Sequence, residues 1–259
     1  MKIRILINIL FLLLICCGLT AQEKELTINE KIGINNLKDH VAYKRKEAVA
    51  KQIKFPLVRC SYFDYYIHNK SEFINSFNTI FDFNQIENFQ ISDWEYILDP
   101  LSLEYYLNSS GYAGIFNDTG MLYLTYISLS DTEKRYLQSL IDKEKETLHP
   151  SIRNYKEPEC VIMAGDYRIR IDVMNDNSLR YTSWKKNKQI SSLPDIVIYD
   201  GYSMGNRIYT SYTFTNGDYV YELSDSILLD DPPSLSVTKS GERILDIELD
   251  YNSFKYFRW

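Results

Sequence analysis

The stretch CVIMAGDYRIRIDVMNDNSLRYTSW, residues 160–184, decides the fold class of this chain. Its β-branched and aromatic runs predict strands over 160–163, 167–172 and 179–184, with a turn at 175–177. Side chains alternate along a strand. The middle strand therefore places Tyr167, Ile169 and Ile171 on one face and Arg168, Arg170 and Asp172 on the other.

The polar face of this strand is the main candidate for a binding site. If it lines a pocket, Arg168, Arg170 and the nearby Trp184 are the residues that would hold an anionic or sugar ligand. The alternative is that this face is solvated or pairs with acidic side chains on neighbouring strands.

Beyond this stretch the pattern contains strands only. They are predicted over 196–199, 209–215, 219–223, 235–237 and 244–249. Thr215–Asp218 contains Asn-Gly, the strongest hairpin signal in the chain. Ser191–Pro194 marks the expected boundary between an α+β domain over 51–190 and a small all-β domain over 195–259.

Helices are predicted upstream. Asn69–Glu72 and Ser130–Glu133 each resemble a capping box, and apolar residues follow both at helical spacing. The second helix must end by His149-Pro150. Between the two helices, 112–116 and 121–127 are expected to form a hairpin through the turn residues 117–120.

The N-terminus predicts export from the cytoplasm. Residues 1–21 have the basic start, the short apolar run and the small or polar end of a secretory signal peptide. Cleavage after Ala21 gives a periplasmic or secreted protein. Alternatively, Leu14–Cys17 resembles an imperfect lipobox, in which Cys17 would carry a lipid anchor and hold the protein at the membrane. Residues 22–50 are polar and are interpreted as a tether or a frayed first helix.

Composition narrows the class of partner. Removing Lys2 and Arg4 with the signal leaves 29 minus 2, or 27, basic residues against 35 acidic ones, a net charge of −8. Lys and Arg are scattered, apart from short runs such as Lys185-Lys186, so nucleic-acid binding is not expected. The 45% hydrophobic content excludes disorder for most of the chain.

Two cysteines remain after cleavage, Cys60 and Cys160. In an oxidising compartment they are a candidate disulfide, and the alternative is two separate buried thiols.

Catalytic and metal-binding patterns are missing from the sequence. The three histidines are His40, His68 and His149, none placed beside a nucleophile. His149 is interpreted as a cation near the carbonyls that end a helix. No His or Cys pair has metal-ligand spacing and no phosphate-binding glycine motif occurs, so neither a metal nor a cofactor is expected.

Residues 53–188 resemble an uncharacterised secreted family of Bacteroidetes with a nuclear transport factor 2-like, or cystatin-like, α+β domain. The resemblance rests on the following segments: 54–57, 69–73, 80–82, 92–94, 111–127, 146–151, 168–172 and 180–184. It implies a cone-like curved antiparallel sheet with helices around a pocket, and by analogy a homodimer. It implies no defined activity, since one fold hosts many functions.

These observations favour a non-enzymatic module that binds a protein or a glycan at the cell envelope. An enzyme with an acid/base carboxylate or tyrosine in the cone is the first alternative. An envelope inhibitor or immunity protein is the second.

Overall fold

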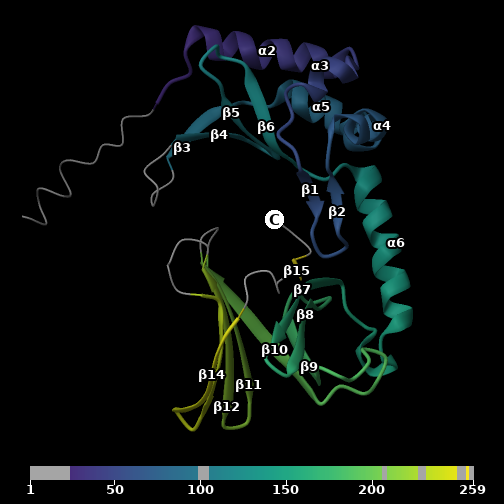
Figure 1. Cartoon of the computed structure of the whole chain (residues 1–259), viewed down its shortest axis with the longest axis vertical. Helices are drawn as coiled ribbons and strands as arrows, with labels where there is room; N and C mark the ends of the chain where they lie inside the picture. Colours follow the sequence, from purple (N-terminus) through teal and green to yellow (C-terminus); the bar gives the residue numbers. More distant parts are fainter. Residues whose placement is uncertain (1–23, 99–104, 206–208, 227–231, 250–254, 257–259) are drawn as a thin grey trace, which may run out of the picture. The chain divides into compact units, whose positions relative to one another are not determined.

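The structure is a computed structural model, and it describes residues 24–98, 105–205, 209–226, 232–249 and 255–256. The expected signal peptide, including Cys17, lies outside these residues. The described chain is α+β, as predicted, with antiparallel sheets, one of them strongly curled. It divides into two compact units (Figure 1). Unit 1 contains the described residues up to Lys54 and Glu87–Ser128, and unit 2 contains Phe55–Ile86 and Leu129 onward. Residues of the expected α+β domain, 51–190, thus belong to both.

Unit 1 begins with a helix where a tether was expected. Helix α2 (Ile28–Ala42) and the short α3 (Lys46–Ala50) occupy this segment. The Thr27 hydroxyl accepts from the Glu30 backbone N–H, and the Glu30 carboxylate accepts from the Thr27 N–H, which forms a capping box. The helix then buries Ile34, Leu37 and Val41. Of the two interpretations, a tether or a first helix, the structure has the helix, which the capping box starts and three buried apolar side chains hold.

Four antiparallel strands complete unit 1 in the order β3-β4-β5-β6. They are β3 (Glu95–Leu98), β4 (Tyr105–Ser109), β5 (Tyr112–Phe116) and β6 (Leu122–Ile127). The predicted hairpin is confirmed as β5–β6. Its turn is held by the Asn117 side-chain oxygen, which accepts from the backbone N–H groups of Thr119 and Met121. The chain passes between the units within α5 (Phe83–Ile91).

Both helices predicted from capping signals are present in unit 2. They are α4 (Lys70–Ile80), capped by Asn69, and α6 (Asp131–Thr147), capped by Ser130 in a full capping box. The capping residue Glu133 has a second role. It is buried and pairs with Arg59 of β1 (Leu57–Cys60), with Nε–Oε1 and Nη2–Oε2 distances of 2.7 and 2.5 Å. This ion pair fixes the start of α6 on the hairpin of β1 and β2 (Tyr65–Ile67).

A single antiparallel sheet of nine described strands dominates unit 2, in the order β14-β13-β12-β11-β10-β9-β8-β7-β15. Its strands are β7 (Glu157–Ala164), β8 (Tyr167–Val173), β9 (Leu179–Lys185), β10 (Ile196–Gly205), β11 (Tyr209–Asn216), β12 (Tyr219–Ser226), β13 (Ser234–Lys239), β14 (Glu242–Glu248) and β15 (Lys255–Tyr256). The predicted Asn216–Asp218 hairpin is confirmed between β11 and β12. The separate all-β domain is not confirmed, because β10 pairs with β9 and so continues the same sheet.

Strand β10 bends the sheet. It pairs with β9 up to Gly201 and with β11 from Tyr202 onward, and a register shift between Ile198 and Gly201 interrupts the pairing with β9. Asp200 has a φ of +59°, and a Cβ on Gly201 would lie 2.1 Å from the Phe214 ring. Only a glycine allows this close approach. The bend gives the sheet its strong curl (Figure 1).

The two faces of β7–β9 belong to different cores. One face joins β10–β13 in an apolar cluster that contains Cys160, Ile169 and Ile171. The other packs against α6 and the segment after β1, in a cluster that contains Cys60, Tyr62 and Trp184. Cys60 and Cys160 are both thiols, so the alternative of two separate buried thiols is the one observed. Burial raises the pKa of Cys60.

Candidate functional site

The predicted alternation along β8 is present. Ile169 and Ile171 are fully buried in the sheet core, whereas Arg170 and Asp172 lie on the opposite face, toward α6. Arg170 is only 3% exposed and Asp172 is fully buried. The polar face of this strand therefore meets protein along half of its length. The acidic partners of Arg170 do not come from neighbouring strands, as the alternative had it, but from α6 (Glu144) and from β8 itself (Asp172).

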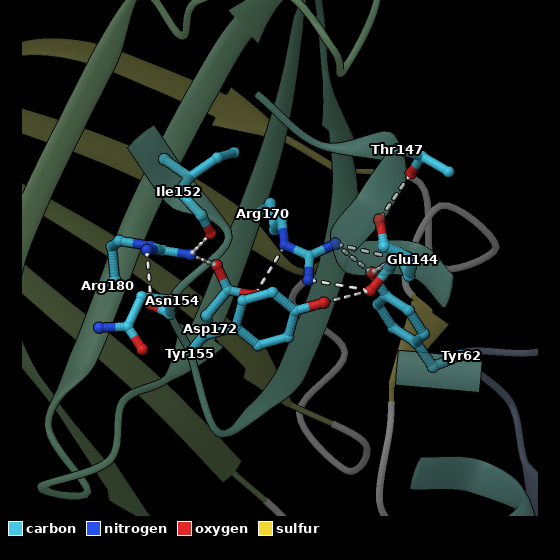
Figure 2. A network of polar contacts seen from close by, with 9 residues as sticks. All are labelled: Tyr62, Glu144, Thr147, Ile152, Asn154, Tyr155, Arg170, Asp172 and Arg180. Atoms are coloured by element: carbon cyan, nitrogen blue, oxygen red, sulfur yellow. Dashed lines mark hydrogen bonds and ion pairs between the residues drawn. The ribbon is translucent and has the colours of Figure 1, made fainter. Parts of the chain in front are cut away.

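Arg170 occupies the centre of a group of polar side chains that we call the buried network: Tyr62, Glu144, Tyr155, Arg170, Asp172 and Arg180 (Figure 2). Its Nε donates to Asp172 Oδ1 at 2.7 Å. Its Nη1 and Nη2 donate to the two Glu144 oxygens at 2.9 and 3.1 Å, and Nη1 also donates to the Tyr62 hydroxyl at 2.6 Å. Four donor contacts from one guanidinium leave Arg170 little capacity to bind a ligand.

The network continues through Asp172 to Arg180 on β9. Asp172 Oδ2 accepts from Arg180 Nη2 at 2.7 Å. Arg180 also donates to the backbone carbonyls of Ile152 and Asn154, at 2.6 and 3.1 Å. The two guanidinium groups thus balance the two carboxylates of Glu144 and Asp172. A buried set of charges of this kind is stable only when each member keeps its partners.

Hydrogen bonding controls the protonation of Glu144. Burial opposes its ionisation, but the Arg170 guanidinium and the Tyr62 and Tyr155 hydroxyls outweigh burial and hold the Glu144 pKa below its usual value. Burial raises the Tyr62 pKa well above its usual value, against the opposing charge of Arg170. At neutral pH Glu144 is a carboxylate and Tyr62 a neutral phenol. Neither group is tuned to exchange a proton near pH 7.

Trp184, expected to help hold a ligand, has its polar group engaged within the protein. Its side chain is fully buried, and its indole N–H donates to the Ser192 carbonyl at 3.0 Å. The same connection between β9 and β10 is held by an ion pair between Lys188 and Asp195, and Asp195 also accepts from the Lys185 backbone N–H. Trp184 and Asp195 therefore fix a loop, residues 186–190, beside the end of β9.

This loop and the sheet line an open pocket of about 630 Å³ in unit 2. Its lining is Tyr62, Glu144, Val161, Arg168, Arg170, Trp184, Lys186, Asn187, Lys188, Gln189 and Ile190. All three predicted binding residues, Arg168, Arg170 and Trp184, thus line one pocket. Arg170 and Trp184 form part of its wall with their polar groups already bonded, which leaves Arg168 as the predicted residue that is available to a ligand.

The outer part of the pocket, which we call the pocket rim, consists of Arg168, Lys186, Asn187 and Gln189. Arg168 is half-buried, and among the described residues its Nη1 makes one long contact of 3.4 Å, to the Lys188 carbonyl. Lys186 is exposed. Within the described segments, no ion pair neutralises either of these two cations. As far as the described residues go, the rim therefore carries positive charge without an ion-pair partner, on a protein that is acidic as a whole.

Sequence reasoning missed Lys186, Glu144 and Tyr62 as pocket residues. The Lys185-Lys186 run was visible, but nothing in the sequence placed it beside Arg168. Glu144 and Tyr62 lie 26 and 108 positions from Arg170, and only the packing of α6 and the segment after β1 brings them to it.

The histidines have other positions. His149 caps the 3₁₀ helix η1 (Pro150–Ile152), where its Nδ1 accepts from the Ser151 backbone N–H at 3.3 Å. The interpretation of His149 as a cation at the end of α6 is therefore wrong, because the imidazole begins the next helix. Across the described part of the chain, no three His, Cys, Asp or Glu side chains cluster so as to hold a metal ion.

No helix within the described residues combines the length and the apolar character that a membrane span requires. Neither a family model, nor a curated protein, nor a solved structure matches this chain.

Proposed function

We propose that this protein is an exported, non-enzymatic binding module that receives an anionic group of a cell-envelope protein or glycan in the pocket beside β8. In this proposal the signal peptide at 1–21 directs export to the periplasm or the medium, or Cys17 anchors the chain to the membrane. The curved sheet and its helices would form a cone of the nuclear transport factor 2-like type.

One observation carries the proposal. Arg168 and Lys186 line the same pocket, and no ion pair with a described residue neutralises them. Cations beside a concave site can bind a carboxylate, sulfate or phosphate through charge-assisted hydrogen bonds. The neighbouring Arg170 and Lys188 contribute little, because Glu144, Asp172 and Asp195 already neutralise them.

The electrostatics favour binding over catalysis. The pocket carboxylate, Glu144, accepts from Arg170 and two tyrosines and has a lowered pKa. A general acid needs a raised pKa near the working pH, and a general base needs access to its substrate. The enzyme alternative would therefore require Glu144 to leave its partners. The inhibitor alternative is a special case of binding in which the partner is another envelope protein.

Binding of anionic probes to the purified protein tests the proposal. The probes are a tetragalacturonate, a short Glu-rich peptide and a peptide with a free C-terminus, with a neutral maltooligosaccharide as reference. The test variant is Arg168→Gln with Lys186→Gln. The matched control is Lys51→Gln with Lys239→Gln, which removes the same charge at positions that do not line the pocket.

We expect at least one anionic probe to bind, with at least tenfold weaker binding by the test variant and unchanged binding by the control. Equal losses in both variants would show a general charge effect and overturn the proposal. Turnover of a probe that Glu144→Gln abolishes would establish the enzyme alternative instead.

A further inference from the structure

The pocket suits a ligand group with a single negative charge. Arg168 and Lys186 supply two cations with no ion-pair partner among the described residues. They suit one carboxylate, bound by the guanidinium of Arg168 and the ammonium of Lys186. Glu144 also lines the pocket and is ionised. A second negative charge on the ligand would approach this carboxylate. The rim therefore selects a ligand with one acidic group at the point of contact rather than a densely charged polymer.

The inner wall of the pocket is apolar on one side. Val161 and Ile190 are partly buried against the cluster that contains Trp184, and all three line the pocket. Sugar hydroxyls placed against these side chains would lose hydrogen bonds to water and gain none. An aliphatic or aromatic group would instead bury apolar surface there. The pocket volume of about 630 Å³ accommodates a group of this size.

The rim also presents two amide side chains. Asn187 and Gln189 are exposed and lie on the same loop as Lys186. A primary amide offers both a donor and an acceptor, which matches the C=O and N–H of a peptide bond. A carboxylate, a compact apolar group and a peptide bond occur together at the C-terminus of a polypeptide that ends in an apolar residue.

We propose that the pocket binds a carboxylate attached to a compact apolar group, and specifically the free C-terminus of a protein or peptide whose last residue is aliphatic or aromatic. This inference rests on the proposed anion-binding function and identifies its ligand class. In the complex the terminal carboxylate contacts Arg168 and Lys186, the last side chain contacts Val161 and Ile190, and the last peptide bonds contact Asn187 and Gln189.

Calorimetric or fluorescence titration of the full protein with short probes tests the inference. The reference probe is the peptide Gly-Ser-Gly-Ser-Gly-Leu with a free C-terminus. Its comparisons are the same peptide with a C-terminal amide, the same peptide ending in Ser, octanoate, and tetragalacturonate. We expect amidation and the Leu-to-Ser change each to weaken binding at least tenfold.

Two protein variants separate the two contacts. Arg168→Gln should abolish the difference in affinity between the free and amidated peptides, because it removes the guanidinium that binds the terminal carboxylate. Ile190→Ser should abolish the difference between the peptides ending in Leu and Ser. Lys239→Gln, outside the pocket, should preserve both differences.

Octanoate binding as tight as that of the peptide would support the shared chemistry and assign the ligand to free amphiphilic acids. Tetragalacturonate binding that depends on Arg168, without peptide or octanoate binding, would overturn this inference and leave the proposed function intact. Binding of no anionic probe at all would overturn both.

Discussion

Arg168 and Arg170 lie two residues apart on the same face of β8, yet one belongs to the pocket rim and the other to the buried network. Arg170 is buried and contacts Glu144, Asp172 and Tyr62. Arg168 is half-buried, and its one described contact is long. The comparison teaches that residue type and strand face do not determine a role. Whether a carboxylate from a distant segment reaches the guanidinium determines it.

The largest expected effect comes from breaking the buried network. Replacing Arg170 with Met should lower the free energy of unfolding by about 3–5 kcal/mol, because Glu144 and Asp172 would lose their shared cation in a buried site. Urea denaturation followed by circular dichroism measures the change. Arg168→Met is the control on the same strand. If the two variants lose similar stability, the distinction between network and rim is incorrect.

A smaller loss is expected from Tyr62→Phe. The Tyr62 hydroxyl donates to Glu144 at 2.5 Å and accepts from Arg170 at 2.6 Å, so the variant removes two contacts and leaves the charges paired. We expect a loss of about 1–3 kcal/mol in the free energy of unfolding. Tyr66→Phe, in β2, provides a hydroxyl deletion outside the network. A double-mutant cycle with Glu144→Gln should give a coupling energy well above zero, and additive losses would contradict the network.

The network should also make stability depend on pH. The Glu144 pKa is lowered in the folded protein, so its stabilising contribution is complete above its unfolded pKa near 4.5 and is lost as the pH falls through the folded value. The difference in unfolding free energy between the native protein and Glu144→Gln should therefore be constant from pH 7 to 5 and shrink below 4.5. Urea titrations at successive pH values measure it. A difference that grows toward acid would show the opposite sign of the pKa shift.

The smallest effect on stability is expected at the rim. Arg168→Gln and Lys186→Gln should each change the free energy of unfolding by less than about 0.5 kcal/mol, since neither side chain has a described ion pair to lose. Thermal unfolding would detect a larger change. A loss of more than about 1.5 kcal/mol in the free energy of unfolding would mean that these cations stabilise the fold and are not available to a ligand.

Local patterns predicted the local structure. The capping box at Ser130–Glu133, the Asn216–Asp218 hairpin and the alternation along β8 depend on residues a few positions apart, and the structure contains all three. The Thr27–Glu30 capping box follows the same rule, but it lies in a polar segment where the apolar stripe is weak, and it was overlooked.

Long-range pairing explains what sequence reasoning missed. The break at Ser191–Pro194 resembled a domain boundary, yet β9 and β10 on either side of it are hydrogen-bonded neighbours. The pocket residues likewise divide into those that a local pattern predicts and those that only long-range packing brings in. Strand alternation found Arg168 and Arg170, but the partners that neutralise Arg170 come from α6 and the segment after β1. No periodicity within one strand contains that information.

The discontinuity of unit 2 has a consequence for the order in which the protein can form. Unit 2 begins at Phe55, is interrupted by the residues of unit 1, and resumes at Leu129. Its last described strand, β15, pairs with β7, and Lys255 of that strand forms an ion pair with Asp64. The first segment of unit 2 therefore meets its buried partners, Glu133 for Arg59 and Arg170 for Tyr62, only after the intervening residues of unit 1 have been synthesised. Unit 1 needs no residue beyond Ser128, so all of its residues are synthesised before α6 and the large sheet of unit 2.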